Sequence, residues 1–405
     1  MRSSRICEMS SNLPPIHLAE RMGRLGTETA FEVLAKAKQL ESQGKNIIHL
    51  EIGEPDFDTP KNIVDAGIQA LKDGYTHYGP AAGMPDAREV VADYVARTRN
   101  ISCHPDEVTI VPGGKPTMFY AMLALIDAGD EVIYPNPGFP IYESMINFVG
   151  GKAVSCPLRE VNGFALDPQD LISRITPKTK MVILNSPANP TGGVTERAEL
   201  DEVIKALKDY PDIWILSDEI YSRMLYDGVE HVSPMQDPEI RSRIILLDGW
   251  SKTYAMTGWR LGFGVMRPDL AQSFTKLMVN SNSCTASFSQ RAGMEALAGE
   301  QGAVDDMLVK FDERRKYIVQ LLNEIPGVSC HLPVGAFYVF PNIAEFGLTS
   351  LEMQNRILNE AGVACLAGTS FGSEGEGYIR FSYANSMENI ENGIARVREF
   401  LASLK

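Results

Sequence analysis

Lys252 is the residue of this sequence whose surroundings most favour covalent chemistry. It lies in the stretch DGWSKTYAMTGWRLG (248–262), shortly after the apolar run RIILL, which is typical of a buried strand. Most lysines are exposed, so a surface turn is the ordinary interpretation of such a position. In a partly apolar pocket, however, the pKa of the amine falls, and the neutral amine can condense with a carbonyl group to form a Schiff base.

Two acids follow another apolar run, in IWILSDEIYSRM (213–224). An unpaired carboxylate at the end of a buried strand is costly, and a protonated heterocyclic nitrogen would remove that cost at Asp218. Tyr221 is close enough along the chain to act on the same ligand, and Glu219 is the next candidate acid. The structural alternative is that Asp218 caps a following helix.

Several residues are suited to anions. The stretch EVTIVPGGKPTMF leads from a strand through Gly114 and Lys115 into a helix, whose free N–H groups attract phosphate, although an ordinary turn is the alternative. The planar guanidinium of Arg260 could donate two hydrogen bonds to the same phosphate, and Ser251 could add a hydroxyl. In GEGYIRFSYAN, Arg380 lies within a short apolar strand and suits a bidentate carboxylate.

Asn189, in MVILNSPANPTGG, adds an amide donor for an oxyanion, or forms a turn that needs no ligand. Together these residues supply a Schiff-base lysine, a phosphate cradle, an acid for a ring nitrogen, donors for a phenolate oxygen and a carboxylate clamp. That set meets the needs of pyridoxal 5'-phosphate bound to an amino acid.

The elements that must position these residues follow an α/β pattern. Short β-branched runs alternate with helix-like stretches, which predicts a mostly parallel sheet between helices, with ligands at the carboxyl ends of its strands. The seven runs are EVTIV (107–111), EVIYP (131–135), KAVSC (152–156), KMVIL (180–184), IWILS (213–217), RIILL (243–247) and LGFGV (261–265).

The pattern changes at both ends of the chain. We expect a large cofactor-binding domain at 60–300, and a smaller α+β domain formed by 1–59 and 301–405. A long amphipathic helix at 303–325 would bridge the two domains. A lone N-terminal helix at 28–44 cannot form its own core, so it should pack on the small domain.

Composition excludes several classes. The net charge, 38 − 52 = −14, argues against nucleic acid or an anionic membrane surface as a partner. No apolar run approaches the length of a membrane span, and the N-terminus lacks the apolar core of a signal peptide. The six cysteines and six histidines show no disulfide framework and no metal-ligand spacing. We therefore expect a cytoplasmic enzyme with reduced thiols and no metal.

Seven ordered stretches resemble the class I/II pyridoxal phosphate aminotransferases of the aspartate aminotransferase fold. They cover the chain from about residue 14 to its end, and they are EIGEPDFDTP, YTHYGPAAGMPDAREVV, PGGKPTMF, SPANPTGG, SDEIYS, GWSKTYAMTGWRLG and YIRFSYA. The resemblance implies transfer of an amino group from an α-amino acid to a 2-oxo acid such as 2-oxoglutarate or pyruvate. It also implies a homodimer with shared active sites.

The resemblance assigns roles residue by residue. Lys252 would carry the Schiff base and act as general acid and base, Asp218 would pair with the pyridinium, and Tyr221 and Asn189 would bind the phenolic oxygen. The remaining positions are Gly114, Lys115, Ser251 and Arg260 for the phosphate, Phe139 stacked on the ring, Tyr78 from the other subunit, and Gly53 and Arg380 at the substrate carboxylate.

The sequence departs from the family pattern at Pro116, which lacks a backbone N–H, and at Phe139, where Trp or Tyr is also common. A carbon–sulfur β-lyase is the alternative activity, because one fold hosts several chemistries. A cofactor-binding regulator fused to a DNA-binding head is disfavoured, because the motifs begin within the first sixty residues. The donor side chain stays open: Arg24, Lys115 and Arg291 are candidate second cations, while Phe31, Phe139 and Tyr78 suit an apolar pocket.

Overall fold

The computed structural model describes residues 16–404, so Cys7 and the rest of the N-terminal segment lie outside the described part. The main sheet has seven strands in the order β2-β8-β7-β6-β5-β3-β4. All neighbours are parallel except β8, which runs antiparallel to β2 and β7. The strands are β2 (Val108–Val111), β3 (Glu131–Asn136), β4 (Lys152–Pro157), β5 (Thr179–Asn185), β6 (Trp214–Asp218), β7 (Ile244–Gly249) and β8 (Gly262–Val265). The predicted α/β fold with a mostly parallel seven-stranded sheet is confirmed.

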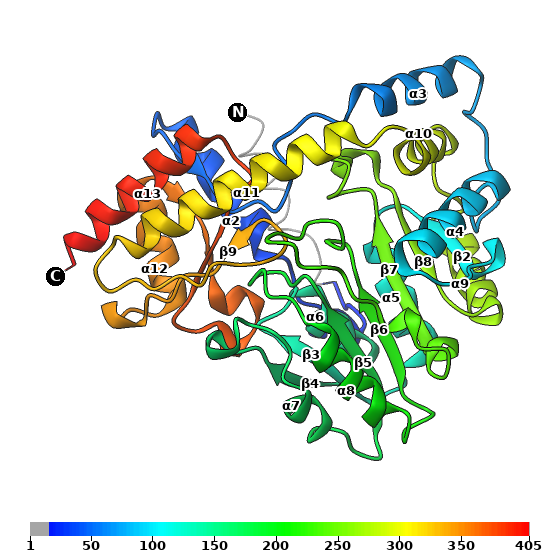
Figure 1. The fold of residues 1–405 in the computed structure, drawn as a ribbon. Helices are drawn as coiled ribbons and strands as arrows, with labels where there is room; N and C mark the ends of the chain where they lie inside the picture. Colours follow the sequence, from blue (N-terminus) through cyan, green and yellow to red (C-terminus); the bar gives the residue numbers. More distant parts are fainter. Residues whose placement is uncertain (1–15, 405) are drawn as a thin grey trace.

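The central strands are continuous apolar runs because both faces of the sheet are buried. In β7, Ile244 and Leu246 belong to one hydrophobic cluster, and Ile245 and Leu247 belong to another. Helices α5 (Lys115–Leu125), α6 (Ile141–Val149) and α9 (Pro268–Ser281) bury their apolar faces in the second cluster. Helices α4 (Pro85–Arg99), α8 (Arg197–Leu207) and α10 (Ser287–Ala298) contribute to the first. Helix α3 (Lys61–Lys72) packs on α10, and α7 (Pro168–Ile172) packs on α8 (Figure 1).

The two ends of the described chain meet beside this sheet. Strand β1 (Ile48–His49) pairs in parallel with β10 (Val363–Ala364), and helix α2 (Thr29–Ser42) contacts β10 and β11 (Leu366–Ala367). A second, antiparallel sheet has the order β11-β12-β9, with β12 at Ile379–Ser382 and β9 at Tyr338–Val339.

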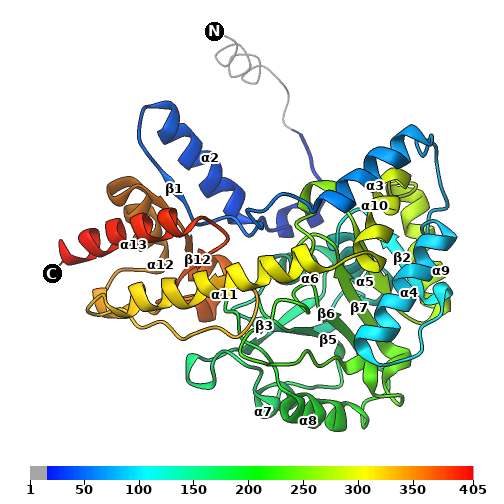
Figure 2. The same cartoon turned by 45° about the horizontal axis from the view of Figure 1, so that its top comes forward.

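Helices α12 (Ser350–Arg356) and α13 (Met387–Ala402) lie on the same side of the molecule, and the long α11 (Gly302–Asn323) runs from there toward α10 (Figure 2). The helix predicted at 303–325 is present at 302–323, and the one predicted at 28–44 is present at 29–42. The division into domains at residues 60 and 300 stays a prediction. Among the helices of residues 16–404, none combines the length and the apolar character needed to cross a bilayer.

The register of the main sheet aligns the strand ends that carry polar residues. Asn185 at the end of β5 pairs with Asp218 at the end of β6, and Asp218 pairs in turn with Leu247 of β7. The loop after β7 carries Lys252. Because these strands are parallel, the loops that follow them leave the sheet at one common edge.

Candidate active site

A cavity of about 520 Å³ lies at this edge of the sheet. It collects residues from the loops after β2, β3, β5, β6 and β7, from the start of α2, and from β9 and β12. Of the predicted site residues, those that line it are Gly53, Gly114, Lys115, Phe139, Asn189, Asp218, Tyr221, Ser251, Lys252, Arg260 and Arg380. Tyr78 does not line it. The topology therefore gathers residues that are more than three hundred positions apart, as the sequence predicted, while their chemical roles remain predictions.

Asp218 is a buried acid that faces the cavity. Its Oδ2 accepts a hydrogen bond from the Tyr142 hydroxyl at 2.7 Å, and its Oδ1 accepts from the Ile220 N–H at 3.3 Å. Burial raises the pKa of this carboxyl to about 6. In the described part of the chain no basic side chain pairs with it, and a turn rather than a helix follows it. Asp218 is thus no helix cap, and it lacks a cationic partner.

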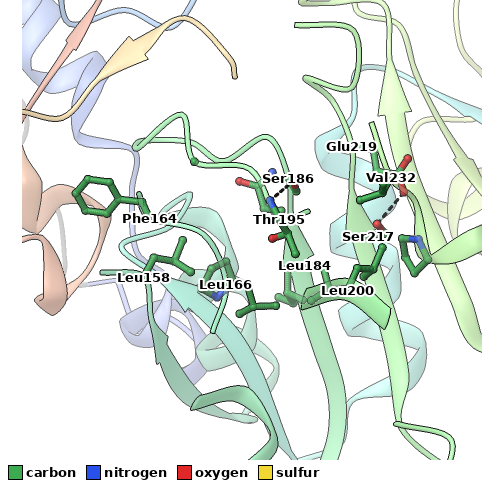
Figure 3. Close-up of a pocket in the computed structure, with 15 residues that line it drawn as sticks. Leu158, Phe164, Leu166, Leu184, Ser186, Thr195, Leu200, Ser217, Glu219 and Val232 are labelled. Carbon is green, nitrogen blue, oxygen red and sulfur yellow. Dashed lines mark hydrogen bonds between the residues drawn. The ribbon is translucent and has the colours of Figure 1, made fainter. Parts of the chain in front are cut away.

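Its neighbour Glu219 points away from this cavity. Glu219 is held by Arg99 at 3.0 Å, by His231 at 2.7 Å and by the Ser233 hydroxyl at 2.6 Å. Burial acts to raise the pKa of this carboxyl, but His231 and Arg99 outweigh it and lower the pKa to about 2. Glu219 and Ser217 instead line a second cavity of about 30 Å³, whose lining residues are drawn in Figure 3. That space suits about one water molecule.

Lys252 lies in the loop after β7 and lines the cavity. Its Nζ donates to the Gly53 carbonyl at 2.5 Å and lies 5.9 Å from the centroid of the Phe337 ring. Burial lowers the pKa of the amine to about 8, against the opposing effect of the Glu28 and Glu54 carboxylates. An amine with this pKa is far more often neutral at physiological pH than an exposed lysine, which suits a nucleophile.

Arg380 is a buried cation on β12. Its Nη1 donates to the Asn189 Oδ1 at 3.0 Å and its Nη2 to the Glu51 carbonyl, while its Nε has no partner in the structure. The guanidinium lies over the rings of Tyr338 and Phe371, at 4.4 and 4.8 Å from their centroids. No carboxylate pairs with it within the described residues. A buried guanidinium in this state is prepared for an anionic ligand.

Arg260 lies against the glycine turn after β2. Gly113 has φ of +85°, a conformation that favours glycine, and a Cβ at this position would displace the Arg260 guanidinium. Arg260 donates from Nη1 to the Thr257 carbonyl at 2.7 Å. The N–H of Lys115, the first residue of α5, has no partner within the helix. The turn, the helix start and Arg260 together form an anion-binding corner.

The side chain of Lys115 lies away from the anion-binding corner. Its Nζ pairs with Glu28 at 2.5 Å rather than with the anion-binding corner, so only its backbone N–H remains for a phosphate. Pro116 occupies the second position of α5, and the Thr117 N–H is already bonded to the Gly114 carbonyl at 3.1 Å. Thr117 therefore does not replace the N–H that Pro116 lacks.

Tyr338, Tyr142 and Glu28 are among the lining residues that sequence reasoning missed. Tyr338 shares a hydrogen bond of 2.7 Å with Tyr221, hydroxyl to hydroxyl, and Tyr142 holds Asp218. Tyr142 lies three residues after Phe139 in the stretch NPGFPIY, and this closeness to a predicted site residue could have identified it. No feature of the sequence around Tyr338 or Glu28 marks either of them as a site residue.

Two candidate second cations lie elsewhere. Arg24 donates to the Asn147 carbonyl at 2.9 Å at the end of α6, and Arg291 pairs with Asp86 at 2.7 Å. Neither lines the cavity of its own chain.

Comparison with known proteins identifies the family. The model of the family "Aminotransferase class I and II" matches residues 45–397. The chain belongs to the class I and II aminotransferases. An aspartate aminotransferase of Pyrococcus horikoshii is 39% identical over 391 residues, which cover 96% of this chain and 98% of the relative.

Two solved structures support this aminotransferase's fold. The aspartate aminotransferase from Rhizobium meliloti has a TM-score of 0.92 and 32% identity over 96% of this chain and 99% of that one. The aromatic aminotransferase from Pyrococcus horikoshii has a TM-score of 0.86 and 37% identity over 91% and 99%. The enzyme transfers an amino group from an amino acid to a 2-oxo acid, and the β-lyase alternative is not favoured. The names of its relatives refer to different donor amino acids, so they do not identify the side chain of this enzyme's donor.

Proposed function

We propose that this aminotransferase uses pyridoxal 5'-phosphate bound to Lys252 and works as a homodimer with shared active sites. The observation that carries the proposal is a pair of buried, opposite and unpaired charges in one cavity, Asp218 and Arg380, with a lysine of lowered pKa beside them. A protonated pyridine nitrogen would compensate Asp218, and the carboxylate of an amino acid would compensate Arg380. The residues therefore fit the cofactor that the family implies.

When bound, the cofactor supplies an electron-accepting ring for the charge that develops at the substrate's α-carbon. Asp218 keeps the ring nitrogen protonated, and Tyr142 orients Asp218. Arg380 binds and orients the substrate carboxylate. Lys252 holds the cofactor and then moves the proton at the α-carbon, for which a pKa near 8 is well matched.

The other residues hold and orient the cofactor. The Asn189 Oδ1 is occupied by Arg380, which leaves its amide N–H₂ as the donor for the ring oxygen beside Tyr221. The anion-binding corner of Gly114, Ser251 and Arg260 binds the phosphate, and Phe139 stacks on the ring, which adds about 0.5–1.5 kcal/mol beyond area burial. We propose that residues 60–300 carry these cofactor contacts, while 1–59 and 301–405 form the smaller domain that brings Gly53 and Arg380.

The dimer is supported by Tyr78 and by the surface near Arg260. Tyr78 is 91% exposed, unusual for a large aromatic residue, and it does not line the cavity of its own chain. Arg260 is exposed as well, and an open hollow of about 640 Å³ adjoins it. A tyrosine from a second copy would cover this corner and reach the phosphate.

The five cysteines in the described part of the chain are free thiols, which supports a cytoplasmic location.

Mixing two inactive or impaired variants tests the shared site. A hybrid of Tyr78→Phe and Lys252→Ala subunits carries one site with both Lys252 and the tyrosine of its partner. After subunit exchange, activity should rise above the mean of the two parents, toward about a quarter of the wild-type value for random pairing into C₂ dimers. Native mass spectrometry verifies the exchange. Verified hybrids without any gain would mean that Tyr78 does not act across the interface.

Covalent capture tests the cofactor assignment. Apoprotein is mixed with pyridoxal 5'-phosphate at different pH values, reduced with borohydride and digested. Because the pKa of Lys252 is lowered from 10.5 to about 8, the neutral amine should increase with pH and the capture rate should level off near pH 8. Below that pH the rate should fall about tenfold per unit. The label should lie on the Lys252 peptide; a label on another lysine, or a plateau only above pH 10, would contradict the assignment.

A further inference from the structure

The outer wall of the cavity contains an ion pair that the cofactor chemistry leaves unused. Glu28 immediately precedes α2, and Lys115 is the first residue of α5. Their side chains meet at 2.5 Å, and both residues line the cavity. Helix α2 packs on β10 and β11, whereas α5 covers the main sheet. The ion pair therefore joins the two sides of the cavity where a substrate side chain would extend.

The charges of the wall determine which side chains it accepts. The cations that line the cavity are Lys115, Lys252, Arg260 and Arg380. Under the proposed function the last three serve the cofactor and the α-carboxylate, so of these four cations Lys115 remains for a second carboxylate. Glu28 already neutralises it. Glu28 is also the acid with the largest electrostatic effect on Lys252, so its negative charge acts within the reacting part of the cavity.

Apolar side chains also line the cavity. Ala30, Phe31 and Ile52 contribute from the α2 side, and Met118 and Phe139 contribute from the sheet side. Phe31 is 59% exposed, which leaves most of its ring free for contact. The Lys115 ammonium lies 5.4 Å from the centroid of the Phe139 ring, an additional reason for it to stay against the wall.

We propose that Glu28 determines specificity: by occupying Lys115, it selects donors with an apolar or aromatic side chain over donors with a second carboxylate. A dicarboxylate must displace Glu28 from Lys115 or lie beside it unpaired, and both are unfavourable. An aromatic side chain meets Phe31 and Met118 and disturbs no ion pair. This inference rests on the proposed function and deepens it.

The test compares phenylalanine with aspartate on the holoenzyme. The kcat/KM of the amino-acid half-reaction is measured from the absorbance of the bound cofactor. In the wild type, phenylalanine should exceed aspartate by at least about tenfold. Glu28→Gln keeps the shape, removes the charge and frees Lys115, so the ratio should move toward aspartate by about tenfold or more. This substitution removes no helix cap, because the Glu28 side chain makes no capping bond.

Matched variants locate the effect. Glu32→Gln changes the same charge on the exposed side of α2 and should leave the ratio as in the wild type. In Glu28→Gln combined with Lys115→Met, the gain for aspartate should disappear. A gain that persists in this double variant would overturn the claim that Lys115 is the group Glu28 occupies.

Unreactive analogues give a readout independent of catalysis. Inhibition constants for 3-phenylpropionate and succinate should show the same preference and the same reversal in Glu28→Gln. A wild type that prefers aspartate and succinate, or a ratio that Glu28→Gln leaves within about twofold, would overturn the proposal. If no amino acid at all converted the bound cofactor, the proposed function itself would fail, and that outcome is distinct from a ratio that does not move.

Discussion

Lys252→Ala will remove nearly all amino transfer. Under the proposed function the variant loses the covalent anchor of the cofactor, and it loses one of the two lysine amines that line the cavity in the described part of the chain. Loss of a positioned acid and base alone costs about 10²–10⁴-fold in rate. Loss of the covalent bond adds to this, so the remaining activity should be close to background. Formation of the amino acid from its 2-oxo acid, followed over hours, measures it.

The control for this variant is Lys310→Ala. Lys310 is an exposed residue of α11 that pairs with Glu313, so its replacement should leave activity and melting temperature nearly unchanged. In Lys252→Ala the fold should persist, because the amine makes only one hydrogen bond, to the Gly53 carbonyl. A folded Lys252→Ala protein that turned over at the wild-type rate would refute the assignment of the active site.

Asp218→Asn should reduce the rate at least about a hundredfold while the protein still folds and binds cofactor. The amide has the same shape, but it has no negative charge to hold a proton on the ring nitrogen. Electrostatic groups placed where charge develops typically account for about 3 kcal/mol or more of the barrier. The fold should survive because the Asn oxygen can accept from the Ile220 N–H, while the Tyr142 hydroxyl turns to accept from the amide.

Tyr142→Phe provides the matched comparison for Asp218→Asn. It removes the hydrogen bond at 2.7 Å but leaves the carboxylate charge, so its loss of rate should be clearly smaller. Cofactor affinity from fluorescence and rate from the half-reaction separate binding from chemistry in both variants. A wild-type rate for Asp218→Asn would remove Asp218 from the mechanism. Glu219 could not replace it, because Arg99 and His231 already hold that carboxylate.

The sheet could be predicted from sequence because its central strands are buried on both faces. A run such as RIILL sends Ile244 and Leu246 to one core and Ile245 and Leu247 to the other, so it has to be apolar throughout. The short strands of the smaller sheet were less visible. AFYVF is apolar over its whole length, but only Tyr338–Val339 forms a strand. The side chains of this stretch are buried because neighbouring segments pack on them, and not because the stretch forms a long strand.

The positions of lining residues could be predicted where a reactive or charged side chain follows a buried strand, as at Asp218 and Lys252, or interrupts a short apolar strand, as at Arg380. Sequence alone could not separate the neighbours Asp218 and Glu219, because alternation across the strand sends one to the ligand and one to Arg99, 120 positions earlier. Glu28 was missed for a related reason. Its meaning depends on Lys115, 87 positions away, and two residues so distant are paired only by the tertiary fold.

Because Asp218 and Arg380 are unpaired, the stability of the folded protein should depend on whether its ligands are bound. Each buried charge without a partner raises the free energy of the empty state, and the cofactor and substrate remove that cost on binding. A ligand present at a thousand times its dissociation constant stabilises the native state by about 4 kcal/mol. Proteases act on the fraction of molecules that is unfolded, so an empty protein is degraded sooner than a filled one. The abundance of this enzyme in a cell would then follow the nutritional supply of its cofactor, even at a constant rate of synthesis.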